Sequence, residues 1–253
     1  MNFFALPEGM PTVAFLGMNR FGEKVYEYLV DHDDTEVLGV FTEESQYSSI
    51  RTLEPEFLIS AGFDYIIPAE ILDVPAEDAI NLHPSFLPYN RGVNPDVWSI
   101  IKDEPAGVTI HYMTPDVDAG SIIAQRTVDV QPSDTGRDLR KRLDRALVKL
   151  FKESWEDIYT GRIVSKTQNL EVGAENRKAD FQKVCEIDLD AEVRVRDFID
   201  RLRALTFTPY HNAYFKKGGS SYYVRISIES EENAQFDEFE WDEPTLFKRS
   251  HHS

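Results

Sequence analysis

Short apolar runs alternate with helical repeats over the first two thirds of the chain. An apolar run at 13–16 ends at a glycine turn, and apolar side chains then recur at helical spacing to about residue 30. The run EVLGVF at 36–41 predicts a second buried strand. A strand, a helix and a strand in this order are typical of a parallel, doubly wound α/β sheet. The turn glycines Gly17 and Gly22 lack the full spacing of a dinucleotide-binding loop, so they indicate a tight turn.

The same alternation continues to about residue 158. Four more strands are expected, at FLISAG (57–62), AINLH (79–83), GVTIHYM (107–113) and SIIAQRTVDV (121–130). Short helices are predicted at AEIL (69–72) and PDVWSII (95–101). The strongest helical signal starts near Thr135, and its apolar face carries Leu139, Leu143, Leu147, Leu150 and Phe151. We therefore expect a Rossmann-like, mostly parallel sheet covered by helices.

The chain changes character after GRIVSKTQ (161–168). The stretch AENRKADFQKV (174–184) is polar and predicts a linker or an extended segment, whereas EVRVRDFIDRLRAL (192–205) predicts an amphipathic helix. The run YHNAYFKKGGSSYYVRISIE (210–229) predicts a β-hairpin that turns at KKGGSS. Three parts are thus predicted: a catalytic domain at 1–165, a small helix and hairpin region at 166–229, and an acidic, partly mobile tail at 230–253.

Composition and charge exclude several classes of protein. Acidic side chains outnumber basic ones by 45 to 27, and a net charge of −18 disfavours a non-specific nucleic-acid binder. An acidic, solvated surface, as in salt-adapted proteins, explains this excess without any partner. The single cysteine, Cys185, allows no intramolecular disulfide and no cysteine cluster for a metal. With no signal-like start and no apolar run of membrane length, we expect a cytoplasmic protein.

Polar residues close the strand predicted at 79–83. Asn81 and His83 are two apart, so both side chains leave the same face, at the carboxyl end where α/β sheets bind ligands. An amide donor beside an imidazole suits attack on a carbonyl, because the amide steadies the oxyanion and the imidazole carries the nucleophile's proton. A carboxylate would orient the imidazole, and the turn MTPDVDAGS offers Asp116 and Asp118. The alternative is that Asn81 and His83 are ordinary turn residues.

The surrounding sequence favours the chemical interpretation. Four segments together resemble the folate-dependent formyltransferase family, which includes the glycinamide ribonucleotide, methionyl-tRNA and sugar-nucleotide N-formyltransferases. These segments are INLHPSFLPYNRG (80–92), NPDVWSI (94–100), GVTIHYMTPDVDAGSIIAQ (107–125) and DTGRDL (134–139). The resemblance implies a catalytic trio of Asn81, His83 and Asp118, with 10-formyltetrahydrofolate as the formyl donor and no metal.

The branch of the family is indicated by two further stretches. RGVNPDVW (91–98) and the C-terminal helix and hairpin resemble the sugar-nucleotide N-formyltransferases. The resemblance therefore implies transfer of the formyl group to the amine of a nucleotide-linked aminodeoxysugar. Two alternatives stay open: an enzyme similar to methionyl-tRNA formyltransferase, and a degenerate module that binds a folate or nucleotide without turnover. The degenerate module stays possible because the connection at 42–56 is short, whereas the family usually carries a longer, strand-bearing connection there.

The resemblance also implies contacts to both substrates. The segment GFDYIIP would border the pterin of the donor, and the residues expected on the donor side are Gly62, Tyr65, Ile66, Ile67 and Asp116. The residues expected on the acceptor side are Asn19, Arg20, Arg91 and Asn94. Small molecules are the expected partners, without nucleic acid or membrane, and a homodimer is left open. The nucleotide (dTDP, GDP or UDP) and the sugar carbon that bears the amine are also left open.

Several of these residues have a structural alternative. Asn19 and Arg20 lie at the first strand–helix turn, where a helix N-terminus attracts a diphosphate. Arg91 either meets a phosphate or holds its loop through backbone carbonyls, and Asn94 either caps the next helix or touches the sugar. His111, within an apolar strand, is expected to be structural. The aromatic residues Trp98, Tyr210 and Tyr222 are expected to pack rather than to bind a ligand.

Overall fold

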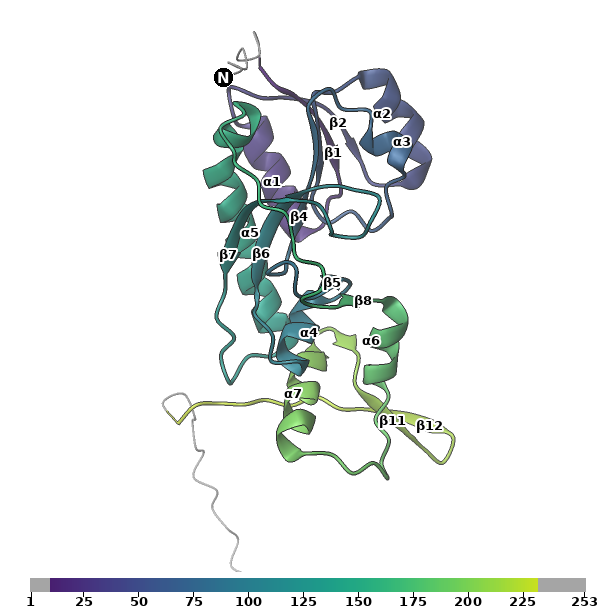
Figure 1. Cartoon of the computed structure of the whole chain (residues 1–253). Coiled ribbons are helices and arrows are strands. Elements are labelled where there is room, and N and C mark those ends of the chain that lie inside the picture. The colour runs from purple at the N-terminus through teal and green to yellow at the C-terminus, as the bar shows by residue number, and fades with distance from the viewer. Residues whose placement is uncertain (1–9, 232–253) are drawn as a thin grey trace, which may run out of the picture.

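A six-stranded sheet forms the centre of the part of the chain that the structure describes, residues 10–231. The structure is a computed structural model, and its strands lie in the order β2-β1-β3-β4-β6-β7 (Figure 1). The parallel strands are β1 (Thr12–Leu16), β2 (Glu36–Phe41), β3 (Phe57–Ser60) and β4 (Asp78–His83). Strand β6 (Gly107–Tyr112) is antiparallel to both of its neighbours, β4 and β7 (Ile122–Thr127). The predicted mostly parallel, Rossmann-like α/β fold is confirmed.

Helices cover both faces of this sheet. Strand β1 alternates between two cores: Val13 and Phe15 belong to the core that includes α1 (Arg20–Val30) and α5 (Gly136–Tyr159). Ala14 and Leu16 belong to the core beneath α2 (Tyr47–Leu53) and α3 (Ala69–Leu72). Figure 1 shows α1 and α5 on one side of the sheet and α2 and α3 on the other. This is the period of two that a strand buried on both faces requires.

Helix α5 agrees with its sequence signal throughout. Thr135 is its N-cap, and the Thr135 hydroxyl accepts a hydrogen bond from the Asp138 backbone N–H at 3.3 Å. The predicted apolar face, Leu139 to Phe151, is buried against the sheet. Arg140, in the second turn of α5, also lines the cavity of the site described below.

Strand β2 was predicted correctly in position but wrongly in burial. Only Phe41 of this strand is buried, because β2 lies at the edge of the sheet. The connection that follows holds a short 3₁₀ helix, η1 (Glu44–Gln46), and α2, and no strand. Ile50 of α2 is fully buried in the second core. The short connection at 42–56 therefore covers its face of the sheet with a single helix of seven residues.

The stretch at 174–184 is not the linker that its composition predicted. It contains β8 (Glu175–Asn176) and most of α6 (Lys178–Cys185). The Asp180 carboxylate accepts a hydrogen bond from the Arg177 backbone N–H at 3.2 Å, which stabilises the first turn. Phe181, Val184 and Cys185 pack against the main core. The apolar stripe of a two-turn helix is too short to stand out in a polar sequence.

The remaining C-terminal elements match their predictions. Helix α7 (Val195–Leu205) is amphipathic, and its buried face joins the same core as α5. Two short strands, β9 (Thr206–Phe207) and β10 (Tyr210–His211), precede the hairpin of β11 (Tyr214–Lys217) and β12 (Ser220–Tyr223). Figure 1 shows α6, α7 and the hairpin at one end of the molecule, beside α4 (Pro95–Ile101). The predicted acidic tail at 230–253 lies outside the described residues, apart from Ser230 and Glu231.

Candidate active site

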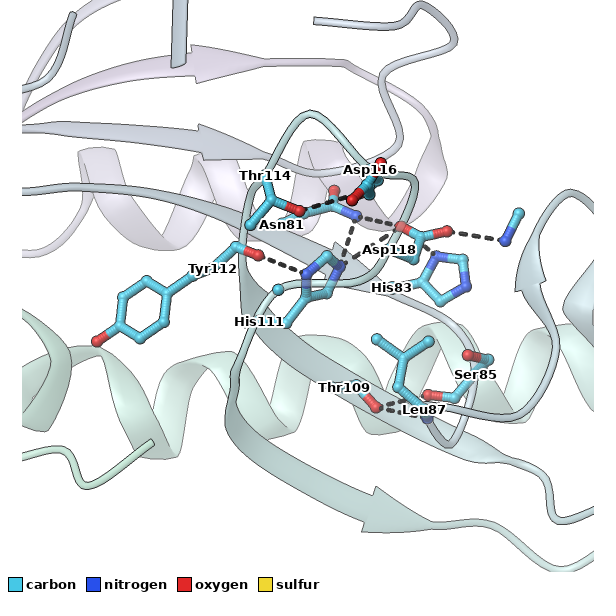
Figure 2. Close-up of polar contacts among 12 residues, drawn as sticks. Asn81, His83, Ser85, Leu87, Thr109, His111, Tyr112, Thr114, Asp116 and Asp118 are labelled. Carbon is cyan, nitrogen blue, oxygen red and sulfur yellow. Dashed lines mark hydrogen bonds and ion pairs between the residues drawn. The ribbon is translucent and has the colours of Figure 1, made fainter. Parts of the chain in front are cut away.

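Three polar side chains meet at the carboxyl end of β4. Asn81 and His83 leave the same face of the strand, and the turn after β6 brings Asp118 to them (Figure 2). Asn81 Nδ2 lies 3.4 Å from Asp118 Oδ1, and His83 Nδ1 lies 3.6 Å from the same oxygen. Asp116, the other candidate carboxylate, is exposed, and its backbone oxygen accepts from Thr114 Oγ1 at 3.1 Å. Of the two carboxylates in this turn, Asp118 is therefore the one that can orient His83.

A second imidazole, that of His111, completes the cluster. The antiparallel register of β4 and β6 sets Asn81 opposite His111. His111 Nδ1 lies 2.8 Å from the Tyr112 carbonyl oxygen, which can only accept, so Nδ1 carries the proton. His111 Nε2 then accepts from Asn81 Nδ2 at 3.2 Å and lies 3.5 Å from Asp118 Oδ1. His111, which its apolar strand indicated to be structural, contacts both Asn81 and Asp118 inside the cluster.

Asp118 is the anionic centre of the cluster. Burial alone would raise the pKa of its carboxyl group, but the neighbouring His83 and the Gly92 N–H, 2.8 Å from Oδ2, lower that pKa well below its usual range. Burial lowers the pKa of His83, and the nearby Asp118 charge only partly opposes this effect. The cluster at neutral pH therefore holds an ionised carboxylate beside a neutral His83.

The two ring nitrogens of His83 have different surroundings. Nδ1 faces Asp118, whereas Nε2 is buried and has no hydrogen-bond partner of good geometry within residues 10–231, and the Asn90 backbone acts to raise the pKa of the ring. His83 as a whole lines the cavity of the site. A neutral imidazole whose Nδ1 faces a carboxylate has its basic lone pair at Nε2, so Nε2 is the atom that would take a proton from a bound ligand.

Residues distant in sequence hold Asp118 in position. Asp118 has a left-handed backbone, with φ of 49°. Gln168 Nε2 donates to the Asp118 carbonyl oxygen at 2.9 Å and to the Gly120 carbonyl oxygen at 2.6 Å. Gly92 has φ of 85°, and a side chain there would overlap the backbone oxygen of Asn176 in the partner strand β8. Gln168 and Asn176, which sequence reasoning missed, thus support the site from outside the predicted catalytic domain.

The loop after His83 is fixed by β6 and β7. Thr109 Oγ1 donates to the Ser85 carbonyl oxygen at 2.7 Å and accepts from the Leu87 N–H at 3.2 Å (Figure 2). Gln125 Nε2 donates to the Leu87 carbonyl oxygen at 2.7 Å. Fully buried Asn90 donates to Ser99 Oγ at 3.2 Å. The loop therefore has little freedom to move relative to the cluster.

A cavity of about 410 Å³ opens at this cluster. Its wall includes all five residues predicted on the donor side, Gly62, Tyr65, Ile66, Ile67 and Asp116. Gly62 has φ of 72°, and the Asn19 side chain fills the space that a side chain at 62 would need. This close approach explains why a glycine stands between β3 and the cavity.

The residues predicted on the acceptor side divide into two groups. Asn19 and Asn94 line the cavity, whereas Arg20 and Arg91 do not. Asn19 Oδ1 caps α1 by accepting from the Gly22 N–H at 3.0 Å, while the Asn94 side chain makes no capping bond to α4. Arg20 is exposed in a neighbouring groove, and Arg91 Nε is buried without a hydrogen-bond partner among the described residues. Arg140 of α5, which no sequence pattern indicated, does line the cavity.

The aromatic residues singled out from the sequence lie away from the cavity. Trp98 is buried, and its Nε1 donates to the Val93 carbonyl oxygen at 3.0 Å. Tyr222 stacks on Phe215 across the hairpin, with ring centroids 5.3 Å apart, and Tyr210 is exposed.

Among residues 10–231, no group of three or more His, Cys, Asp or Glu side chains could hold a metal ion. None of the helices in this part of the chain has the length and apolar character of a membrane span.

Comparisons with known families identify the two parts of the chain. The formyl transferase family matches residues 27–154, which contain the cluster and most of the cavity wall. The N-formyltransferase dimerization C-terminal domain matches residues 180–230, which contain α7 and the hairpin.

Individual relatives agree with this assignment. A dTDP-4-amino-4,6-dideoxyglucose formyltransferase of Mycobacterium bovis is 36% identical over 169 residues, 66% of this chain and 71% of the relative. A sugar N-formyltransferase structure from a Shewanella species has a TM-score of 0.79 and 28% identity, over 87% of this chain and 99% of that one. The formyltransferase PseJ of Anoxybacillus kamchatkensis, in complex with UDP-4,6-dideoxy-4-formamido-L-AltNAc and tetrahydrofolate, has a TM-score of 0.58 and 34% identity, over 68% of this chain and 88% of that one. With its fold, its cluster and these matches in agreement, the chain belongs to the formyl transferase family, as the sequence resemblance implied.

Proposed function

We propose that this chain is a sugar N-formyltransferase that moves the formyl group of 10-formyltetrahydrofolate to the amine of a nucleotide-linked aminodeoxysugar. The observation that carries the proposal is the cluster of Asn81, His83 and Asp118 at the wall of the 410 Å³ cavity. The relatives named above supply the substrate class, since their names specify aminosugars linked to dTDP or UDP.

The cluster can carry the proton that this reaction moves. The neutral amine of the sugar attacks the formyl carbon, and negative charge develops on the formyl oxygen. His83 Nε2 accepts a proton from the amine as the new C–N bond forms. That proton passes to N10 of the folate as the old C–N bond breaks, which leaves a formamide and tetrahydrofolate without net proton release. Asp118 remains ionised and stabilises the imidazolium that forms in between.

Asn81 is the proposed donor to the formyl oxygen. Without a ligand, its amide nitrogen donates to His111 Nε2 at 3.2 Å and to Asp118 Oδ1 at 3.4 Å. Both distances exceed the usual 2.9–3.0 Å or so of a strong N–H···O bond. One of these long bonds must be exchanged for a bond to the developing oxyanion. Such an exchange costs little in the ground state and gains most when the charge develops.

The cavity also suits the donor molecule. Phe63, Ile66, Ile67 and Met113 add apolar side chains to the cavity lining, and the polar residues Asp64 and Thr114 line it as well. A planar pterin needs this combination of apolar faces and hydrogen bonds along its edge. We therefore place the folate on the side of 62–67 and the sugar on the side of Asn19 and Asn94.

The two alternative functions, a methionyl-tRNA formyltransferase-like enzyme and a binding module without turnover, can be distinguished by their products. The net charge of −18 opposes binding of a tRNA, and the C-terminal family match is to a dimerization domain of N-formyltransferases. The test is to incubate the protein and donor with 3-amino and 4-amino sugars linked to dTDP, UDP or GDP, and separately with charged initiator tRNA. We expect tetrahydrofolate and a sugar formamide in equal amounts. Formylated tRNA without any sugar product would overturn the proposal, and binding without any product would favour the degenerate module.

The assembly and location are part of the same proposal. The match of 180–230 to a dimerization domain supports a homodimer. Sedimentation equilibrium should then give twice the 29.1 kDa mass of the chain, and a monomer at micromolar concentration would contradict this. We also propose a cytoplasmic location, because a single cysteine suits a reducing compartment.

A further inference from the structure

The connection at 42–56 is short but firmly anchored to the sheet. Its helix α2 buries Ile50 completely in the core that it shares with β3 and α3. At the start of the connection, Gln46 Oε1 accepts from the Thr42 backbone N–H at 2.8 Å and from the Glu43 backbone N–H at 3.0 Å. Both the first turn and the helix of the connection are therefore fixed in position.

The loop between β3 and α3 has little support of its own. Its residues 62–67 belong to no helix or strand, and all six line the cavity of the site. Between residues 10 and 231, a single hydrogen bond reaches the backbone of 62–67: the Tyr47 hydroxyl donates to the Ile66 carbonyl oxygen at 3.1 Å. A loop of this kind depends on its neighbours for a fixed shape.

Three contacts from the connection hold this loop. Besides its bond to Ile66, Tyr47 contacts Phe63, with ring centroids 6.1 Å apart. The Tyr65 hydroxyl donates to Glu43 Oε2 at 3.3 Å. Phe63, Tyr65 and Ile66 line the cavity, whereas Tyr47 and Glu43 do not. The connection therefore acts on the cavity through the loop.

The Tyr47 hydroxyl is suited to hold a carbonyl oxygen. Partial burial and the nearby Glu44 carboxylate raise the pKa of this hydroxyl above its usual value. The hydroxyl therefore stays protonated, and able to donate, at any pH near neutrality.

We propose that Tyr47 is a positioning residue for the formyl donor, which fixes the loop at 62–67 in the shape that binds the folate. Its hydroxyl holds the Ile66 carbonyl oxygen, and its ring supports Phe63. This inference rests on the proposed function, which places the folate on this side of the cavity. The connection at 42–56 then contributes to the donor site in spite of its length, so its shortness does not favour the degenerate module.

The first test measures folate binding without any turnover. The full chain and its variant Tyr47→Phe, which keeps the ring and loses only the hydroxyl, are titrated calorimetrically with 5-formyltetrahydrofolate. The Kd should rise about three- to tenfold, because loss of one neutral hydrogen bond lowers the population of the loop shape that binds. Tyr214→Phe is the matched control, since the Tyr214 hydroxyl also makes a 3.1 Å bond, to Glu186 Oε2, but Tyr214 lies in β11 and does not line the cavity. An unchanged Kd in Tyr47→Phe, or an equal rise in Tyr214→Phe, would overturn the proposal.

The second test separates positioning from stability. With 10-formyltetrahydrofolate and a nucleotide sugar, Tyr47→Phe should raise the KM of the donor about three- to tenfold, leave kcat within about threefold and leave the KM of the acceptor unchanged. Urea unfolding is measured on the same variants. A lower stability of Tyr47→Phe with an unaltered donor KM would give Tyr47 a structural role only and refute the proposal.

The same measurements separate the role of Tyr47 from the proposed function. Turnover of a nucleotide sugar at a donor KM that Tyr47→Phe does not alter would refute the positioning role alone. Weaker folate binding by Tyr47→Phe, in an enzyme that formylates no nucleotide sugar, would support the positioning role and refute the proposed acceptor. If the parent protein bound no folate at 1 mM or so, both the positioning role and the proposed function would be refuted.

Discussion

Replacing Gly92 with alanine tests whether the backbone around Asp118 is part of the catalytic apparatus. Gly92 has φ of 85°, and its N–H donates to Asp118 Oδ2 at 2.8 Å. A methyl group there would overlap the Asn176 backbone oxygen, so strands β5 (Arg91–Gly92) and β8 must separate. We expect Gly92→Ala to weaken both the fold and the cluster.

The magnitude follows from two contributions. The left-handed backbone costs a residue with a side chain about 1–2 kcal/mol. Separation of β5 from β8 also removes the hydrogen bond to the ionised Asp118, which contributes about 1.5–3 kcal/mol. Together these predict a loss of about 2.5–5 kcal/mol in the free energy of unfolding. Displacement of Asp118 should also lower kcat about 10–100-fold, the typical effect of a misplaced catalytic group.

Gly161→Ala is the matched control for Gly92→Ala. Gly161 also has a positive φ, 67°, but apart from its own chain neighbours no residue between 10 and 231 has an atom within 4 Å of the position of an added side chain. It should therefore show only the backbone cost of about 1–2 kcal/mol, with unchanged kcat. Urea unfolding and steady-state kinetics on the parent protein and both variants measure these effects. If Gly92→Ala matched Gly161→Ala in both stability and kcat, the role assigned to the Gly92 N–H would be refuted.

Four further predictions concern the cluster itself. His83→Asn and Asp118→Asn should each lower kcat by about 10²–10⁴. The double variant should lower kcat by far less than the product of the two single effects, and a reduction equal to that product would mean that the residues act independently. Asn81→Ala should lower kcat by about 10²–10³ at an unchanged KM for the donor, and a loss seen only in KM would contradict an oxyanion role. Because burial lowers the pKa of His83 and the Asp118 charge raises it, Asp118→Asn should lower this pKa further; an NMR titration of the imidazole that shows a rise would contradict the charge arrangement. Gln168→Leu should lower kcat about tenfold with little change in nucleotide binding, and an unaltered kcat would show that the Asp118 carbonyl oxygen needs no support.

The sequence predicted the positions of the three proposed catalytic side chains better than those of the residues that support them. Asn81 and His83 sit at the end of a regular strand, and Asp118 lies in the next turn of the sheet, so strand order and alternation suffice to bring them together. The supports come from far away: Gln168 follows Asp118 by 50 positions, and no local pattern marks a side chain that binds a distant carbonyl oxygen.

The burial of strand β2 and the presence of helix α6 could not be predicted from the local sequence either. The strand at 36–41 is as apolar as a central strand, but its position at the edge of the sheet depends on the order in which all strands pair. The helix at 178–185 is stabilised by Phe181, Val184 and Cys185 against a core made by other elements. Composition alone gives such a segment no preference for a helix over a linker.

The hydrogen bonds that reach Asp118 and its loop from residues 168 and 176 limit how this enzyme can be recombined. A chimera that joined residues 1–165 to the C-terminal part of another protein would inherit all three proposed catalytic side chains but not the amide of Gln168 or the strand that pairs with Gly92. A junction placed after β8 would transfer the cluster together with both supports. The segment that can be exchanged as a working module is therefore longer than the segment that contains the catalytic residues.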